Sequence, residues 1–310
     1  MIISKRPELK KLKHIKHEII KDELGVFKDF VDVMEDKVNL DIFYYKHVDI
    51  RFINEINHRH LGVCLAEYVP LKRTILYSED NFKESIMHEL FHVASTLVGK
   101  DTIYLGLCHI DRKTKVSYGI GLTEGVTCLL DDKYFCNYTK SKKDVVGNSY
   151  FLLKRVCSYI EMIYGSDFIE ECYFNADLQT FINVLANDIG LEDVHILMCA
   201  LDNMHAAHLG CLKGFFNSIK ATKVLFDNFN VVLRVIEKMY YKNIYENLLN
   251  GNISKSEFDN AIGYLRELVG QQVKSTIIPY YSRRISDSEF DDIADGVKNE
   301  VLLKRKLKEM

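Results

Sequence analysis

Along most of the chain, apolar residues recur with the three- and four-residue spacing of helices, whereas Leu40–Tyr77 consists of short β-favouring runs. Glycines at positions 99, 165 and 190 stand where helices are expected to end. The pattern predicts helices over residues 5–36 (broken near Gly25), 81–98, 122–135, 145–164, 176–188, 192–208 and several beyond 215.

The β-favouring stretch contains a strand, turn, strand unit. Leu61–Val69 and Arg73–Tyr77 flank the turn sequence Pro70-Leu71-Lys72. With the helices that follow, this predicts a predominantly helical α+β fold with a small antiparallel sheet near the N-terminus. A polar segment at residues 139–143 suggests a boundary between an N-terminal α/β subdomain (1–140) and a helical C-terminal subdomain (141–310).

Composition and charge are those of a soluble globular protein. Hydrophobic residues form 47% of the 310 residues, charged residues form 27%, and the formal net charge is −3. This balance provides no global basic field, so neither nucleic acid nor an anionic membrane is expected as a partner. The first residues lack the apolar core of a secretory signal, and the eight cysteines are scattered without a C-x-x-C pair. We therefore expect a cytoplasmic protein with reduced thiols. Nothing in the sequence specifies its oligomeric state.

The segment of residues 82–98 is apolar over most of its helical circumference, and its single polar strip carries His88, Glu89 and His92. Such a helix is buried, so the strip faces a cleft or an interior polar site. His88 and His92 are four residues apart and can both bind one tetrahedral cation, while Glu89 can accept a proton from a metal-bound water. The alternative is a buried helix whose histidines are hydrogen-bonded to core carboxylates or carbonyls.

A catalytic zinc takes a third protein ligand, and two downstream carboxylates are candidates. Asp111 has a short side chain and lies in a basic segment that looks like an exposed loop. Glu124 lies at the start of a predicted helix, and its neighbour Gly125 permits close approach of a second helix. Thr127, one turn further on, could hydrogen-bond a metal ligand. We therefore predict that Glu124, and not Asp111, is the third ligand.

A strand, an H-E-x-x-H helix and a helix that begins with the sequence GLTEGVT (residues 121–127) together resemble the gluzincin metallopeptidases. The likeness is closest to poorly characterised bacterial and phage members with a helical C-terminal half. It covers roughly residues 61–135 and continues more loosely through Tyr150–Phe174. The resemblance implies a zincin fold around a Zn²⁺ ion. Its implied site residues are the zinc ligands His88, His92 and Glu124 and the general base Glu89.

The chain departs from the thermolysin pattern at Cys128, where an aspartate would support a zinc histidine. The supporting group is therefore left open, with Thr127 and Asp131 as candidates. The donor that would stabilise a developing oxyanion is also open. Its candidates are Tyr118, His109, His205 and His208.

The resemblance also implies the reaction, which is hydrolysis of peptide bonds in a peptide or protein. Such a substrate would bind by strand addition along Arg73–Tyr77. Two other functions stay open on the residues alone: a zinc hydrolase of non-peptide substrates, and a zinc-binding regulatory or scaffold protein without turnover. Glu89 favours an enzyme, because a scaffold has no need of a base.

Overall fold

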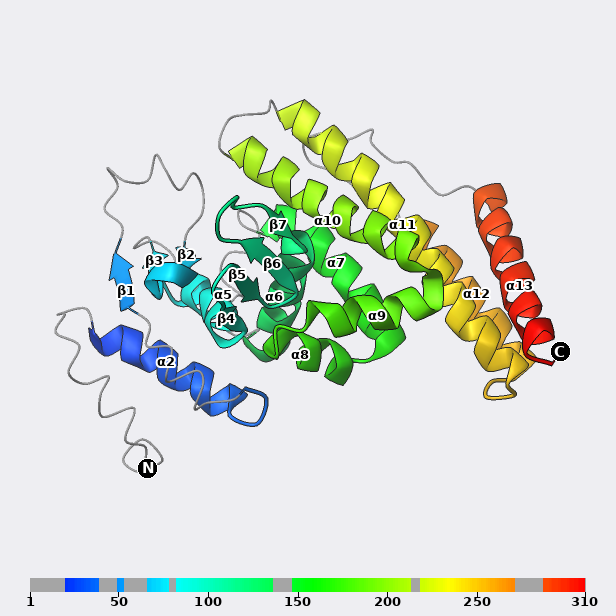
Figure 1. Cartoon of the computed structure of the whole chain (residues 1–310), viewed down its shortest axis with the longest axis horizontal. Helices are drawn as coiled ribbons and strands as arrows, with labels where there is room; N and C mark the ends of the chain where they lie inside the picture. The colour runs from blue at the N-terminus through cyan, green and yellow to red at the C-terminus, as the bar shows by residue number, and fades with distance from the viewer. Residues whose placement is uncertain are drawn as a thin grey trace.

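The computed structural model describes residues 20–38, 49–52, 66–77, 82–135, 147–212, 218–270 and 287–309. In chain order the elements are α2 (Ile20–Met34), β1 (Asp49–Phe52), β2 (Ala66–Val69), η3 (Pro70–Lys72), β3 (Thr74–Tyr77), α5 (Phe82–Ala94), β4 (Thr96–Val98), β5 (Thr102–Leu105), β6 (Cys108–Asp111), β7 (Ser117–Tyr118), α6 (Ile120–Phe135), α7 (Gly147–Tyr164), α8 (Ser166–Phe174), α9 (Leu178–Ile189), α10 (Leu191–Leu212), α11 (Ser218–Leu249), α12 (Lys255–Gly270) and α13 (Asp287–Glu309). The fold is α+β and predominantly helical, as the sequence predicted, with the strands gathered towards the N-terminal side of the molecule (Figure 1). Among the described helices, none combines the length and the apolar character needed to cross a membrane.

The predicted strand, turn, strand unit is present in the first sheet, whose order is β1-β3-β2. β2 and β3 are antiparallel and pair Tyr68 with Ile75, and the turn between them is the 3₁₀ segment η3. β3 also pairs with β1, in parallel, so both of its edges are occupied. The expectation that Arg73–Tyr77 offers a free edge to a substrate is therefore wrong, and β2 lies at the border of the described sheet instead.

A second, four-stranded antiparallel sheet of order β4-β5-β6-β7 was not predicted from the sequence. Its first strand occupies residues 96–98, which the sequence analysis assigned to the end of the α5 helix. α5 ends at Ala94, where the Ser95 hydroxyl donates to the Phe91 carbonyl and the Thr96 hydroxyl donates to the His92 carbonyl. These bonds satisfy carbonyls at the end of the helix, and the chain then continues as β4.

The helix boundaries differ from prediction in two further places. α2 runs through Gly25 without a break, and residues 5–19 of the predicted helix lie outside the described residues. α8 was not expected, and it follows α7 after the single residue Gly165. Gly165 and Gly190 do end helices, both with positive φ, whereas Gly99 lies in the turn between β4 and β5. The boundary proposed near residue 140 falls outside the described residues.

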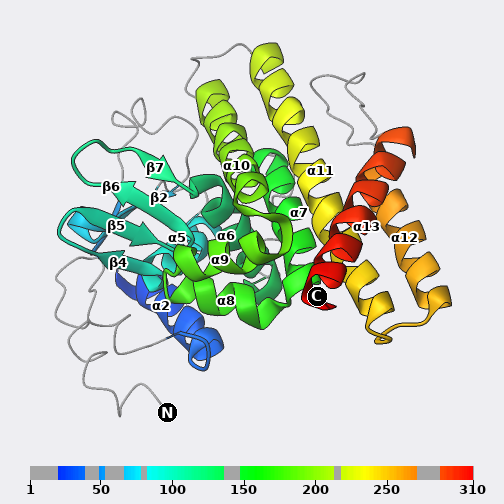
Figure 2. The same ribbon diagram turned by 45° about the vertical axis from the view of Figure 1, so that its right-hand side comes forward.

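One hydrophobic core runs through the helices, from Phe30 on α2 to Val297 on α13. The apolar face of α5 lies within it, with Ile86, Leu90 and Phe91 fully buried, which confirms the burial expected from its pattern. α10 and α11 lie side by side, and α12 and α13 pack against α11 on the side away from the sheets (Figure 2). The polar strip of α5 faces α6, where Glu124 meets the two histidines, and β2, where the Tyr68 backbone meets Glu89.

Candidate metal centre

The polar strip of α5 brings two imidazoles together. The rings of His88 and His92 lie 4.9 Å apart between centroids, with their planes 76° apart. Their side chains are 17% and 5% exposed, so both are largely shielded from water. Two buried rings in contact require a polar partner for their nitrogens.

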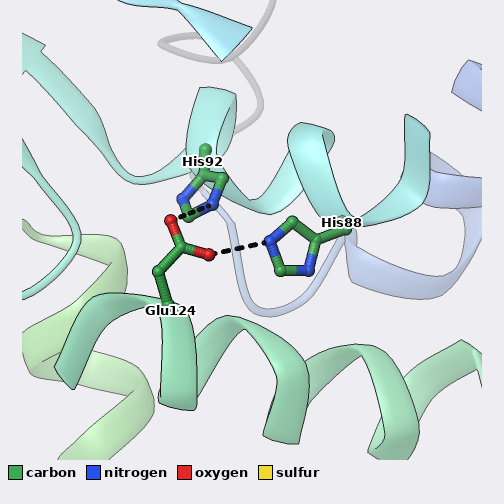
Figure 3. Close-up of side chains that lie close together, drawn as sticks. All are labelled: His88, His92 and Glu124. Carbon is green, nitrogen blue, oxygen red and sulfur yellow. Dashed lines mark hydrogen bonds and ion pairs between the residues drawn. The ribbon is translucent and has the colours of Figure 1, made fainter. Parts of the chain in front are cut away.

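α6 supplies that partner through the carboxylate of Glu124 (Figure 3). The Nε2 atom of His88 lies 3.2 Å from Oε2 of Glu124, and Nε2 of His92 lies 3.4 Å from Oε1. The three residues offer ligand atoms that all lie within 4.8 Å of one another. Two donors bound to one tetrahedral zinc at about 2.0–2.1 Å would be separated by about 3.3–3.4 Å. The two His–Glu distances, each to a different oxygen of the Glu124 carboxylate, are in this range, and one ligand atom from each of the three residues lies within 4.8 Å of the others.

The charges in this cluster favour a positive centre between the three side chains. Burial alone would raise the pKa of Glu124, but the imidazoles of His92 and His88 hold it well below its usual range. Burial would likewise lower the pKa of His88, and contacts with Cys128 and Glu124 instead raise it well above its usual range. An ionised carboxylate between two imidazoles is an arrangement that a proton or a metal cation can satisfy.

Gly125 allows α6 to approach α7 closely, as its sequence position suggested. A Cβ atom at this residue would lie 2.6 Å from Sγ of Cys157 and 2.8 Å from the carbonyl oxygen of Leu153, both on α7. Such distances are far below van der Waals contact, so the two helices can pack this way only with glycine here. Glu124 directly precedes Gly125, so the close packing of α6 on α7 helps to fix the distance between the Glu124 carboxylate and α5.

Glu89 lies beside the imidazole pair and has a different partner. Its Oε2 accepts a hydrogen bond of 2.7 Å from the backbone N–H of Tyr68 in β2. The residue is 8% exposed, and burial raises the pKa of its carboxyl group, against the opposing effect of His92 and His88. A carboxylate with raised proton affinity next to a cluster of candidate metal ligands is suited to accept a proton.

Cys128, which stands where the thermolysin pattern has an aspartate, contacts a histidine. Sγ of Cys128 lies 3.9 Å from Nδ1 of His88, on the side of the ring opposite to Glu124. Thr127 does not have the expected role, because its hydroxyl bonds the Thr123 carbonyl and the Tyr173 hydroxyl. That expectation was wrong because Thr127 points along α6 into the core, where it is fully buried.

The four candidate oxyanion donors fall into two groups. His205 and His208 on α10 both contact Tyr150, at ring distances of 6.0 and 5.2 Å. The Tyr150 ring in turn stacks at 6.2 Å from His88, so this histidine pair borders the candidate site. The other two candidates have separate partners: Tyr118 bonds His195 at 2.8 Å, and His109 contacts Tyr104 across the second sheet.

Asp111 is not part of the cluster that His88 and His92 form with Glu124, and it has a local structural role. It ends β6, is exposed, and its Oδ1 accepts backbone hydrogen bonds from Lys113 and Thr114. These bonds to Thr114 hold the pKa of Asp111 below its usual value. The structure thus brings Glu124, and not Asp111, to His88 and His92.

Three residues of the site region were missed in the sequence, namely Tyr68, Tyr150 and Asp202. Each acts from an element distant in sequence from α5, and none lies in a motif that would mark it. The five cysteines whose side chains the structure describes form no disulfide with one another. Comparison with protein-family models, with curated proteins and with solved structures finds no match to this chain.

Proposed function

We propose that the chain is a zinc-dependent metallopeptidase in which His88, His92 and Glu124 hold the zinc ion and Glu89 is the general base. One observation carries the proposal: the three candidate metal ligands form one cluster, and the carboxylate of the neighbouring residue Glu89 is kept apart from it. Three ligand atoms converge within 4.8 Å, while the adjacent buried carboxylate of Glu89 is bonded to a different group. A structural polar cluster has no need of that second carboxylate.

The residues suit zinc by their chemistry. Two imidazoles and one carboxylate form a ligand set of catalytic zinc sites, which leave a fourth position for water or substrate. The depressed pKa of Glu124 provides the negative charge that a buried dication requires. When bound, zinc would act as a Lewis acid and would lower the pKa of a water molecule at the open position.

Glu89 has the proton-transfer role in this proposal. The hydrogen bond from Tyr68 fixes one oxygen of its carboxylate, so the proton of the attacking water is taken by the other oxygen. Its raised pKa favours holding that proton until the amine of the leaving group accepts it. Burial of Glu89 keeps the proton from being lost to solvent.

An extended peptide is the substrate class that the surroundings favour. Among the described strands β2 lies at the border of the first sheet and next to α5. A peptide that pairs with the β2 backbone groups other than the Tyr68 N–H, which already donates to Glu89, would pass Glu89. On the other side, burial and the charge of His205 lower the pKa of His208 to about 4, against the effect of Glu124. A neutral imidazole in this position can donate a hydrogen bond to an oxygen that gains negative charge.

The test compares wild type with Glu89→Gln on a peptide library, with the metal content of each protein measured. The proposal predicts about one zinc per chain in both proteins and hydrolysis by the wild type alone. Zinc in both proteins with no hydrolysis of any peptide by the wild type would favour the scaffold function. Hydrolysis of esters or amides outside the peptide class, with peptides left intact, would favour a non-peptide hydrolase.

A further inference from the structure

The first turn of α6, which directly precedes Glu124, is capped by a side chain from α10. Oδ2 of Asp202 accepts a hydrogen bond of 2.8 Å from the backbone N–H of Gly119, and Oδ1 accepts one of 2.9 Å from Gly121. The first N–H groups of a helix have no partners within the helix, and a carboxylate also interacts favourably with the helix dipole. Such caps usually come from a neighbouring residue, but Asp202 is distant in sequence.

The capping contact is built into the packing of the two helices. A Cβ atom at Gly121 would overlap the backbone of Leu201, so α10 touches the backbone of α6 at this point. Gly119 has a φ of +90°, a conformation that favours glycine, and it turns the chain from β7 into α6. The two backbone N–H groups that donate to Asp202 therefore belong to glycines, and no larger residue fits at either position.

The same turn is also tied to the second sheet. The Thr123 hydroxyl donates to the Leu105 carbonyl of β5 at 3.1 Å. The backbone of Gly119 and Gly121 is thus bonded to α10, and Thr123 is bonded to β5, so the first turn of α6 is held by two other elements. Glu124 comes directly after Thr123, so the position of its carboxylate over His88 and His92 depends on where this turn is held.

We propose that Asp202 is a positioning residue of the metal centre, which holds the start of α6 so that Glu124 meets the two histidines of α5. The inference rests on the proposed zinc site and adds a residue outside it. It also makes α10, which carries the His205 and His208 pair one and two turns further on, a structural part of that site. A cap that merely stabilises the fold would not affect zinc affinity.

The experiment measures zinc affinity in competition with a chelator of known affinity, for wild type, Asp202→Ala and Asp202→Asn. Residues that support metal ligands typically change metal affinity about 10- to 100-fold when replaced. We expect a weakening of this size for Asp202→Ala. Asp202→Asn should lie between wild type and alanine, because its amide oxygen can still accept one of the two backbone N–H groups. The visible spectrum of the cobalt-loaded protein should change in the same order.

Asp177→Ala is the matched control, because Asp177 also caps a helix. Its carboxylate accepts from the backbone N–H of Thr180 at the start of α9. This variant should lose stability while keeping the zinc affinity and the cobalt spectrum of the wild type. Wild-type affinity and spectrum in both Asp202 variants would overturn the inference, and Asp202→Asn alone decides if the alanine variant does not fold. Failure of the wild type to bind zinc would instead refute the proposed function.

Discussion

The α5–α6 region and the α11–α13 layer each contain a buried glutamate, and the two carboxyl groups differ in their surroundings. Glu124 faces two imidazoles, and its pKa is held well below the usual range. Glu237 on α11 is 1% exposed, and neither of its carboxyl oxygens has a hydrogen-bond partner within the described part of the chain. Burial, together with the charge of Glu289, raises the pKa of Glu237 to about 8, against Arg266 and Arg234.

Burial, with the added repulsion of Glu289, thus favours the neutral form of Glu237, whereas the two imidazoles keep the buried carboxylate of Glu124 charged. At Glu124 the partners come from a different helix and are arranged around one point, which is the pattern expected of a binding site. The glycines of the two regions differ in the same sense. Gly125 on α6 touches the next helix, whereas a Cβ at Gly263 on α12 would meet no atom of the described residues within 4 Å. The helix backbone at Gly125, beside the candidate site, is thus in contact with another helix, and the helix backbone at Gly263 is not.

The largest expected effect is on turnover, from Glu89→Gln. Loss of a general base typically lowers a rate about 10²- to 10⁴-fold, and we expect at least this loss in kcat/KM on a validated peptide. Zinc content and thermal unfolding should stay close to wild type, because glutamine can still accept the hydrogen bond from Tyr68. Loss of the metal in this variant, or retention of full activity, would show that Glu89 has been assigned the wrong role.

The second prediction separates the two carboxylates considered for the third ligand. Glu124→Ala should weaken zinc affinity more than the roughly 100-fold upper range for residues that only support a ligand. Asp111→Ala is the control and should leave zinc affinity unchanged, since Asp111 is exposed and bonded within its own turn. Isothermal titration with zinc measures both. Equal losses in the two variants would contradict the site.

The third prediction contrasts the two glycines. Gly125→Ala should lower the free energy of unfolding by about 1–3 kcal/mol, because the added methyl group would meet the backbone of Leu153. Gly263→Ala should raise it by up to about 1 kcal/mol, because alanine is the better helix former and the site is open. Chemical denaturation checks both values. A stabilised Gly125→Ala protein would mean that α6 and α7 are not in this contact.

The last prediction concerns Glu237 and the change of stability with pH. Its pKa is about 8 in the folded protein and near 4.5 when unfolded, so the unfolded chain releases the proton first as pH rises. The contribution of Glu237 to stability should be largest below about pH 4.5 and should fall towards about pH 8. Glu237→Gln should remove this part of the slope, which chemical denaturation at a series of pH values measures. Glu267→Gln, on the exposed face of α12, should leave the slope as in wild type.

The sequence predicted the local features of the site well, because they depend on periodicity and short spacing. The burial of α5, the strip with His88 and His92, and the close approach at Gly125 all follow from helical geometry. The sheet of residues 96–118 was missed because its strands are two to four residues long and carry little pattern of their own. Such strands are specified by pairing with each other.

Contacts between distant segments could not be read from the sequence. The bond from Tyr68 to Glu89 and the cap from Asp202 to α6 join residues that share no motif, and each depends on how whole elements pack. The error at Arg73–Tyr77 has the same origin. That segment was recognised as a strand, but its position in the middle of the sheet depends on β1, which pairs with it from further up the chain.

X-ray absorption spectroscopy at the zinc edge would show whether His88, His92 and Glu124 bind one zinc ion. For the zinc-loaded protein we expect two imidazole nitrogens at about 2.0–2.1 Å and carboxylate or water oxygen at about 2.0–2.2 Å, with no sulfur. Each contribution should be lost selectively on replacing its ligand, so that Glu124→Ala keeps the imidazole signal of any zinc that remains bound. A sulfur shell at about 2.3 Å would place Cys128 in the site, and an apo protein that takes up no zinc would contradict the claim altogether.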